Sequence, residues 1–232
     1  MKNFRLLVTK KISPSLVLQA GLKGVDILEK EFIRIVPVVN DQLNKKIIRL
    51  ATEEHTVVFT SKNAVSSIAA INTFVTADWK IFCIDGATKD EVKKYIPAGN
   101  IEGTAQNASL LAKVIAEKSE NRKIIFFCGN KRIEDLPGFL LTRNFDVEEL
   151  VVYNTELVPQ KIIDDFDAVA FFSPTAAESF FSVNNLKETV VCFSVGRTTT
   201  EAIIKYTENE VITAVKPSEE TIIELAIKQS KY

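Results

Sequence analysis

The chain has 232 residues, of which 46% are apolar and 25% charged, and its formal net charge is −1. This composition is typical of a globular protein with one large or two small domains, and the near-zero charge does not favour a nucleic-acid-binding surface. No apolar run reaches the ~18 residues of a membrane helix, and the opening MKNFRLLVTKKIS is too weakly apolar for a signal peptide. We therefore expect a cytoplasmic protein that binds neither membranes nor nucleic acids.

Short apolar runs alternate with amphipathic segments along the whole chain. This alternation predicts βαβ units and parallel sheets, and strands this apolar should be covered by helices on both faces. Clear helical patterns fall at residues 89–96, 109–119 and 219–229. The predicted strands are 4–9, 32–38, 56–60, 80–84, 100–102, 123–128, 147–154, 167–172, 190–195 and 211–214.

Cysteine and histidine are too sparse to suggest a metal site. Cys83, Cys128 and Cys192 each lie in a predicted strand with no CxxC spacing, and we expect buried strand cysteines. The only histidine, His55, follows two glutamates just before a strand and is expected in a solvated loop. One histidine cannot supply a His-based cluster, so no metal site is predicted.

Part of the sequence occurs twice at a nearly constant offset of 111 or 112 residues. Three consecutive strand–helix units match in this way, which is more than alternation alone would give. The repeat therefore indicates two similar α/β domains. The matched pairs are VVFTSKNAV (57–65) with VAFFSPTAA (169–177), Thr88 with Thr199, and NASLLAKVIAEK (107–118) with SEETIIELAIKQ (218–229).

The first copy has a fourth unit, residues 123–155, whose counterpart lies at the other end of the chain. An offset of 120 places Asp26 on Asp146 and Ile27 on Val147. The sequence thus predicts one discontinuous domain interrupted by an inserted one, with two extended crossings that pair as an antiparallel ribbon. The cleft between the domains is the expected site. The predicted bounds are 1–35 plus 155–232, the inserted 39–149, and linkers near 33–38 and 148–155.

The sequence lacks the GxGxxG, GxxxxGK and GxSxG motifs of nucleotide binding and serine catalysis. It has instead strand-to-helix turns rich in Ser, Thr, Asn and Gly, which in a parallel sheet lie where ligands bind and present N–H groups to anions. Helix capping alone explains any single turn equally well, but five such turns favour a polyanionic ligand. The turns are 60–64, 86–89, 128–132, 173–177 and 196–200, with Lys62, Lys131, Arg132 and Arg197 adding charge.

Tyr153 breaks the symmetry of the repeat, because its counterpart at an offset of 120 is Ile33. It is predicted at the domain crossing, beside the cleft. A phenol with a pKa of ~10 can donate a proton at neutral pH. A packing role at the domain interface is the alternative.

The segments FTSKNAV, CGNKRIEDLP, VEELVVYNT, FFSPTAAESF and VGRTTTEAI together resemble the uroporphyrinogen-III synthase family over nearly the whole chain. The resemblance implies two α/β domains, one discontinuous and flavodoxin-like, joined by a two-stranded ladder. It also implies a monomer that needs no cofactor. Its reaction would close linear hydroxymethylbilane, with loss of water and inversion of the last pyrrole ring through a spiro intermediate, to uroporphyrinogen III in haem biosynthesis. The many carboxylates of that substrate would account for the anion-suited turns.

The resemblance further implies roles for single residues. Tyr153 falls on the tyrosine of the family's VYxT motif and would assist departure of the hydroxyl. Asp85 stands where the family usually has a glycine, and an aspartate there would repel a carboxylate. Lys10 stands where an arginine is often found, and keeps its charge without the bidentate fork. The implied substrate-binding residues are Ser61, Lys62, Asn63, Thr88, Gly129, Asn130, Lys131, Arg132, Ser173, Pro174, Arg197, Thr198 and Thr199.

Two other functions stay open at this point. One is a non-catalytic two-domain binder of small polyanionic ligands, and the other is a family relative that has become a regulatory domain. All would bind an anion, but only an enzyme would consume the bilane.

Overall fold

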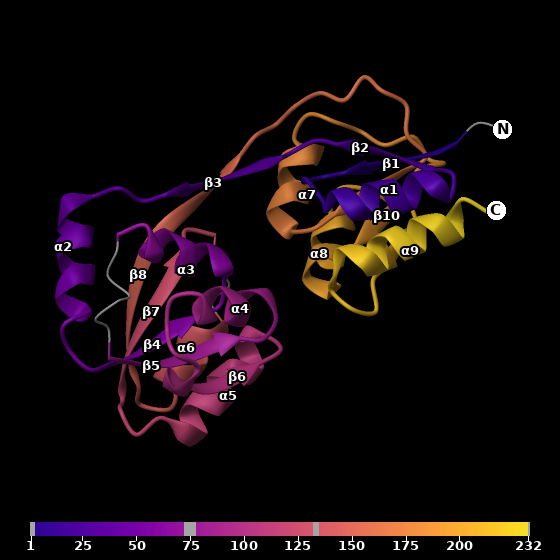
Figure 1. Cartoon of the computed structure of the whole chain (residues 1–232). Coiled ribbons are helices and arrows are strands. Elements are labelled where there is room, and N and C mark those ends of the chain that lie inside the picture. Colours follow the sequence, from indigo (N-terminus) through magenta and orange to yellow (C-terminus); the bar gives the residue numbers. More distant parts are fainter. Residues whose placement is uncertain (1–2, 72–77, 132–134, 232) are drawn as a thin grey trace. The chain divides into compact units, whose positions relative to one another are not determined.

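A computed structural model of the chain describes residues 3–71, 78–131 and 135–231 (Figure 1). The chain divides into two compact units, which we call unit 1 (Met1–Arg34 with Glu156–Tyr232) and unit 2 (Ile35–Thr155). Each unit is an α/β sandwich with a mainly parallel sheet. The predicted fold class is therefore confirmed.

Unit 1 contains β1 (Phe4–Val8), α1 (Pro14–Leu22), β2 (Val25–Glu29), β9 (Ala168–Phe171), α7 (Pro174–Phe181), β10 (Val191–Ser194), α8 (Arg197–Ile203), β11 (Val211–Thr213) and α9 (Glu219–Gln229). Unit 2 contains α2 (Asp41–Leu50), β4 (His55–Phe59), α3 (Lys62–Ala69), β5 (Trp79–Ile84), α4 (Ala87–Lys93), η2 (Ala98–Asn100), β6 (Ile101–Ala105), α5 (Ala108–Lys118), β7 (Lys123–Gly129) and α6 (Asp135–Leu141). The strands β3 (Ile33–Pro37) and β8 (Asp146–Leu157) carry the chain from one unit to the other.

The sheet of unit 1 has the order β11-β10-β9-β1-β2 within the described residues, and its neighbouring strands pair in parallel. Read from β2 in chain order, this is the 2-1-3-4-5 arrangement of flavodoxin-like folds. Alternate residues of β1 face opposite sides: Leu6 and Val8 pack with α1 and α9, and Leu7 packs with α7 and α8. Helices thus cover both faces, as the apolar strands predicted.

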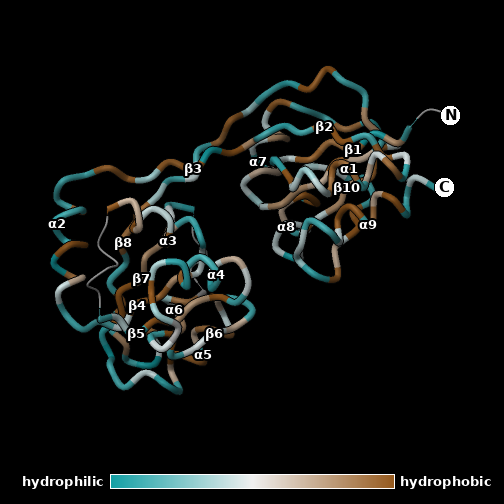
Figure 2. Tube along the Cα trace, viewed as in Figure 1, coloured by the Kyte–Doolittle hydropathy of each residue, from teal (hydrophilic) through white to brown (hydrophobic). Residues whose placement is uncertain are grey.

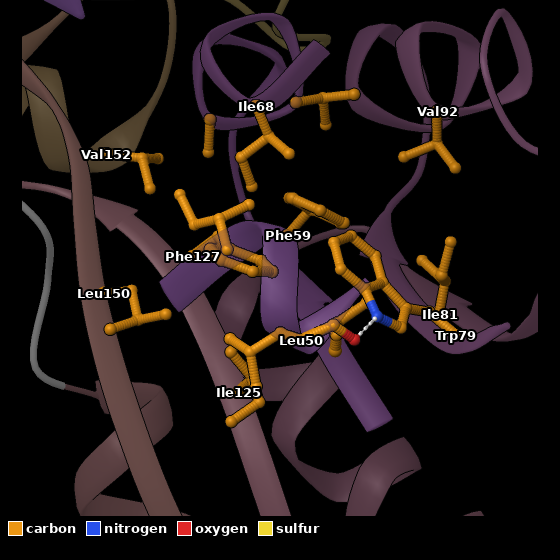
Figure 3. Close-up of a cluster of buried hydrophobic side chains, with 14 of the residues drawn as sticks. Leu50, Phe59, Ile68, Trp79, Ile81, Val92, Ile125, Phe127, Leu150 and Val152 are labelled. Carbon is orange, nitrogen blue, oxygen red and sulfur yellow. Dashed lines mark hydrogen bonds between the residues drawn. The ribbon is translucent and has the colours of Figure 1, made fainter. Parts of the chain in front are cut away.

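The sheet of unit 2 has the order β3-β8-β7-β4-β5-β6 in the part of the chain that the structure describes. Helices α2, α3 and α4 cover one face, and α5 and α6 cover the other. Figure 3 shows the first of these cores, where Phe59 and Phe127 stack with ring centroids 5.4 Å apart and the fully buried Trp79 donates its indole N–H to the Leu50 carbonyl at 2.8 Å.

The two units repeat the same strand order. Around β4 and β7 of unit 2 the order β8-β7-β4-β5-β6 corresponds to β2-β1-β9-β10-β11 of unit 1. β8 is one continuous strand, whereas its counterpart in unit 1 is divided into β2 and β3. β3 and β8 are antiparallel, because Val38 bonds to the Val152 carbonyl while Val158 bonds to that of Phe32. The predicted ladder is therefore present.

Two sequence predictions are wrong in detail. The strand β2 was not predicted, because it is an edge strand in which only Val25 is fully buried and Asp26 interrupts the apolar run. His55 is the first residue of β4 and its side chain is 16% exposed, so it does not lie in a solvated loop. The three cysteines are buried and free, as predicted, and burial raises the pKa of Cys83 to about 11 and of Cys192 to about 12.

The distribution of hydropathy follows this layered packing. Figure 2 shows brown, hydrophobic colour along central strands such as β4 and β7, while α2 alternates between teal and brown. Among the described residues, no helix combines the length and the apolar character needed to cross a bilayer.

The indole of Trp79 provides a test of the unit 2 core. We expect Trp79→Phe to lower the free energy of unfolding by about 1–3 kcal/mol, because the buried Leu50 carbonyl would lose its donor. Urea denaturation followed by circular dichroism measures this loss. Tyr95→Phe, an aromatic substitution on the exposed surface of the same unit, is the control and should change stability much less. Equal losses of stability in the two variants would contradict a stabilising role for the hydrogen bond between Trp79 and Leu50.

Candidate active site

Parallel pairing brings the turns after the strands to one edge of each sheet. In unit 2 these are the turns that follow β4, β5 and β7, and in unit 1 those that follow β1, β9 and β10. Flavodoxin-like sheets bind ligands where the strand order reverses, between β4 and β7 in unit 2 and between β9 and β1 in unit 1. This places the turns of Ser61 and Asn130 side by side in unit 2.

Two of the predicted serines cap helices. Ser61 accepts the backbone N–H of Asn63 at 3.2 Å at the start of α3, and Ser173 accepts that of Ala176 at 3.1 Å at the start of α7. Lys62 and Pro174 follow them on exposed positions. The capping alternative is therefore true of both serines, although each hydroxyl keeps its own proton for another acceptor.

Tyr153 lies on the Ser61 side of the sheet because β8 contains a bulge. β8 pairs with β7 in register up to Cys128 and Val151, and the next pair is Gly129 with Tyr153, so Val152 is the extra residue. Successive strand residues normally face opposite sides. Here Val152 and Tyr153 both pack against the core beneath α3, since a bulge re-aims the side chain that follows it.

The ring of Tyr153 lies directly over the backbone of Gly129. A Cβ atom at residue 129 would stand 2.5 Å from the ring carbon Cζ and 2.8 Å from the phenol oxygen, so only glycine fits there. Burial raises the pKa of the Tyr153 phenol, and a side-chain hydrogen bond with Ser61 offsets part of this rise. The phenol is therefore protonated at neutral pH.

Asn130 bonds to the bulged strand at two points. Its backbone N–H donates to the Tyr153 carbonyl at 3.2 Å, and its side-chain oxygen accepts the N–H of Thr155 at 2.8 Å. The side chain of this exposed residue is thus joined to β8 immediately after the tyrosine. Lys131 follows it and is also exposed, whereas Arg132 lies outside the described residues.

The two predicted threonines are less accessible than the serines. Thr88 is 6% exposed and Thr199 is 2% exposed, and the helices that contain them begin after Gly86 and Gly196. Thr198, next to Thr199, is exposed. The structure therefore leaves the backbone and Thr198, rather than the two buried hydroxyls, as the open part of these turns.

Asp85 is charge-compensated within its own turn. Lys89 donates to its carboxylate at 3.2 Å, and a hydrogen bond from Thr104, followed by that from Lys89, holds the pKa of Asp85 below its usual value against the opposing effect of burial. Neither partner of Asp85 was predicted from the sequence. The spacing of Asp85 and Lys89 is an i,i+4 signal that could have found one of them, but Thr104 comes from the neighbouring strand and leaves no local signal.

Two cations of unit 1 at this edge, Lys10 and Arg197, are paired as well. Lys10 lies 2.5 Å from Glu219 and over the ring of Phe172, with its nitrogen 4.8 Å from the centroid. Arg197 bonds to Glu201 at 2.8 Å but is 90% exposed, so this pair competes weakly with a ligand. Within the residues described, no group of three or more His, Cys, Asp or Glu side chains could hold a metal ion.

The fold and the turn-lined sheet edges define a class of two-unit α/β proteins, of which solved structures are known. A mutant uroporphyrinogen III synthase from the extremely thermophilic bacterium Thermus thermophilus has a TM-score of 0.68 to this chain at 14% identity, covering 98% of both chains. The uroporphyrinogen-III synthetase of Helicobacter pylori also has a TM-score of 0.68, at 16% identity, covering 97% of this chain and 99% of its own. No curated protein matches the chain in sequence.

The family itself follows from the sequence. The family model described as uroporphyrinogen-III synthase HemD matches residues 16–224. The chain therefore belongs to the uroporphyrinogen-III synthase family, the lyases of tetrapyrrole biosynthesis. The resemblance and the enzyme class predicted from the sequence are confirmed, and the alternative of a non-catalytic binder is not favoured.

The environment of Asp85 provides a second test. We expect its carboxyl to titrate below the ordinary aspartate pKa, and both Thr104→Val and Lys89→Ala to raise that pKa, because each removes a group that stabilises the carboxylate. Carboxyl-carbon NMR during an acid titration measures these values. Because the pKa is lowered on folding, the stabilisation is present at neutral pH and lost as the pH falls through the folded-state pKa. An unchanged Asp85 pKa in both variants would contradict the assignment of these two partners.

Proposed function

We propose that this chain closes linear hydroxymethylbilane to uroporphyrinogen III, with loss of water and inversion of the last pyrrole ring through a spiro intermediate. Its membership of the uroporphyrinogen-III synthase family carries the proposal. The substrate is a small molecule, and the proposed reaction needs no cofactor.

Tyr153 is the proposed acid. Its pKa is raised and its oxygen bonds to Ser61, which leaves the phenol proton for the departing hydroxyl. As the C–OH bond breaks, the hydroxyl takes this proton and leaves as water, while the electron-rich pyrrole nitrogen stabilises the cation that remains. The phenolate formed is stabilised by the hydrogen bond from Ser61.

Most of the remaining catalysis is proposed to be positioning. The substrate carries many carboxylates, and the turns at the sheet edges supply backbone N–H groups, hydroxyls and exposed cations that suit them. We assign these contacts to Lys62 and Asn63 at the start of α3, Lys131 after β7, and Arg197 and Thr198 in unit 1, while Pro174, which has no backbone N–H, is proposed to contact the substrate only with its ring. Ser61, Ser173, Thr88 and Thr199 complete the set, with the buried threonines acting through their turns.

The decisive experiment supplies freshly generated hydroxymethylbilane and separates the oxidised porphyrin products by isomer. Uncatalysed closure gives the type I porphyrin. A protein-dependent change to type III supports both the reaction and the ring inversion. Type I alone, at the background rate, would contradict the proposal, and the anion-binding alternative would then lead.

We also propose that the protein is a cytoplasmic monomer and that residues 39–149 form the inserted domain. Sedimentation of the purified protein tests the first point, and cell fractionation tests the location. Expression of residues 39–149 alone, followed by circular dichroism, tests the domain bounds.

The role of Tyr153 gives the third prediction. Tyr153→Phe should lower kcat by roughly 10–100-fold without abolishing type III product, because one acid contributes about 10²-fold and positioning is retained. Tyr206→Phe, a partly exposed tyrosine of unit 1, is the control and should leave kcat unchanged. Since the phenol pKa is raised, wild-type kcat should not fall with loss of this proton until the pH exceeds about 10. An unchanged kcat in Tyr153→Phe would contradict the acid role.

A further inference from the structure

The turn formed by Gly129 and Asn130 lies beside Tyr153, and its contacts point to β8 rather than to open solvent. Resemblance to the family suggested both residues as substrate ligands. The side-chain oxygen of Asn130 is already bonded to the N–H of Thr155, and the Cα of Gly129 is covered by the tyrosine ring. These contacts indicate a role for Gly129 and Asn130 other than substrate binding.

We infer that Gly129 and Asn130 are positioning residues, which hold the bulge of β8 and thereby place the phenol of Tyr153 beside Ser61. The inference rests on the proposed function for its catalytic meaning, but the positioning is a property of the fold. Neither residue needs to touch the substrate.

The direction of the Tyr153 side chain depends on the bulge in β8. If β8 ran through Val152 without a bulge, Tyr153 would continue the alternation of the strand and face the side to which the partly exposed Val151 points. The bulge turns the phenol by one position to the face of Leu150 and Val152, where α3 begins. The whole placement of the acid therefore depends on the bulge.

Contacts with Asn130 hold the bulge of β8 in place. A bulge leaves backbone groups of the strand without their regular partners. Asn130 holds β8 directly after the bulge, since its N–H bonds to the Tyr153 carbonyl and its side-chain oxygen accepts the Thr155 N–H. One residue thus holds β8 at the tyrosine and two positions beyond it.

The ring of Tyr153 also needs space over residue 129. With the bulge fixed, the ring must lie over residue 129, and any Cβ there would meet Cζ at 2.5 Å. A Cβ atom and a ring carbon at this distance would overlap, so one of them would have to move. Glycine is therefore required by the tyrosine, and not by the turn, because Gly129 does not have a positive φ.

Asn130 can be tested with variants that separate the two roles. Asn130→Ala removes the acceptor for Thr155 and should lower kcat by roughly tenfold or more, with KM little changed, because the acid is misplaced. Asn130→Asp retains an acceptor oxygen and should restore most of kcat. If Asn130 were instead a ligand for substrate carboxylates, both substitutions would impair the enzyme. Aspartate would impair it most, because its negative charge would repel the carboxylates. The inference would be overturned if Asn130→Ala changed only KM, or if Asn130→Asp had a kcat as low as that of Asn130→Ala.

A matched control exists at the other end of β7. Asn121 also accepts a strand N–H with its side-chain oxygen, that of Lys123 at 2.9 Å, but far from Tyr153 along the strand. Asn121→Ala should therefore leave kcat unchanged. Equal losses in Asn121→Ala and Asn130→Ala would mean that the bond acts only through general stability.

Gly129 is tested without any activity measurement. Gly129→Ala should lower the thermal midpoint markedly in the wild-type background and much less in the Tyr153→Ala background, where the ring is absent. Ring NMR signals of Tyr153 should also shift in Asn130→Ala and return in Asn130→Asp. An equal loss of midpoint in both backgrounds would overturn the positioning role of Gly129. If no variant, nor the wild type, makes type III product while these effects appear, the proposed function fails and the positioning stands.

Discussion

Parallel pairing of the strands is the constraint on which the rest of this structure depends. It requires helical crossovers, which cover both faces of each sheet and make the strands apolar throughout. It also sends every strand-to-helix turn to the same edge of its sheet. The turns of residues that are distant in sequence, such as Ser61 and Asn130, therefore lie side by side, although nothing in the sequence around either residue indicates this.

Much of the fold could be predicted because the repeat and the apolar runs are local signals. The alternation gave the element types, and the offset between the copies identified corresponding strands, including the match of Asp26 with Asp146. The failures occurred where neighbours in space decide the outcome. Val25–Glu29 is a strand because it pairs with β1, although its own residues are only partly apolar. His55 is enclosed because β4 begins one residue earlier than its pattern suggests.

The candidate site was less predictable, because residue type does not reveal accessibility. The repeat drew attention equally to the serines and the threonines, yet Thr88 and Thr199 are buried within their turns. Asp85 was expected to repel an anionic substrate. The hydrogen bond that lowers its pKa most comes from Thr104 in β6, which the sequence around Asp85 does not reveal. The bulge that turns Tyr153 inward could not be seen at all, because it exists only in the pairing of β8 with β7.

The strand of the repeat that forms β2 in unit 1 and β8 in unit 2 has a different role in each unit. In unit 1 the chain after β2 leaves the sheet, and the fully buried Phe32 packs edge-on against Phe180 at 5.3 Å before β3 begins. In unit 2 the corresponding segment stays paired with β7 as far as Gly129 and bulges there. Ile33, the counterpart of Tyr153, packs in a core instead of presenting a polar group. The presence of a phenol at this position in unit 2 alone is therefore a consequence of how β8 is paired. The reaction proposed here needs a single acid and otherwise careful placement of a polyanion, which suits such an asymmetric pair of units.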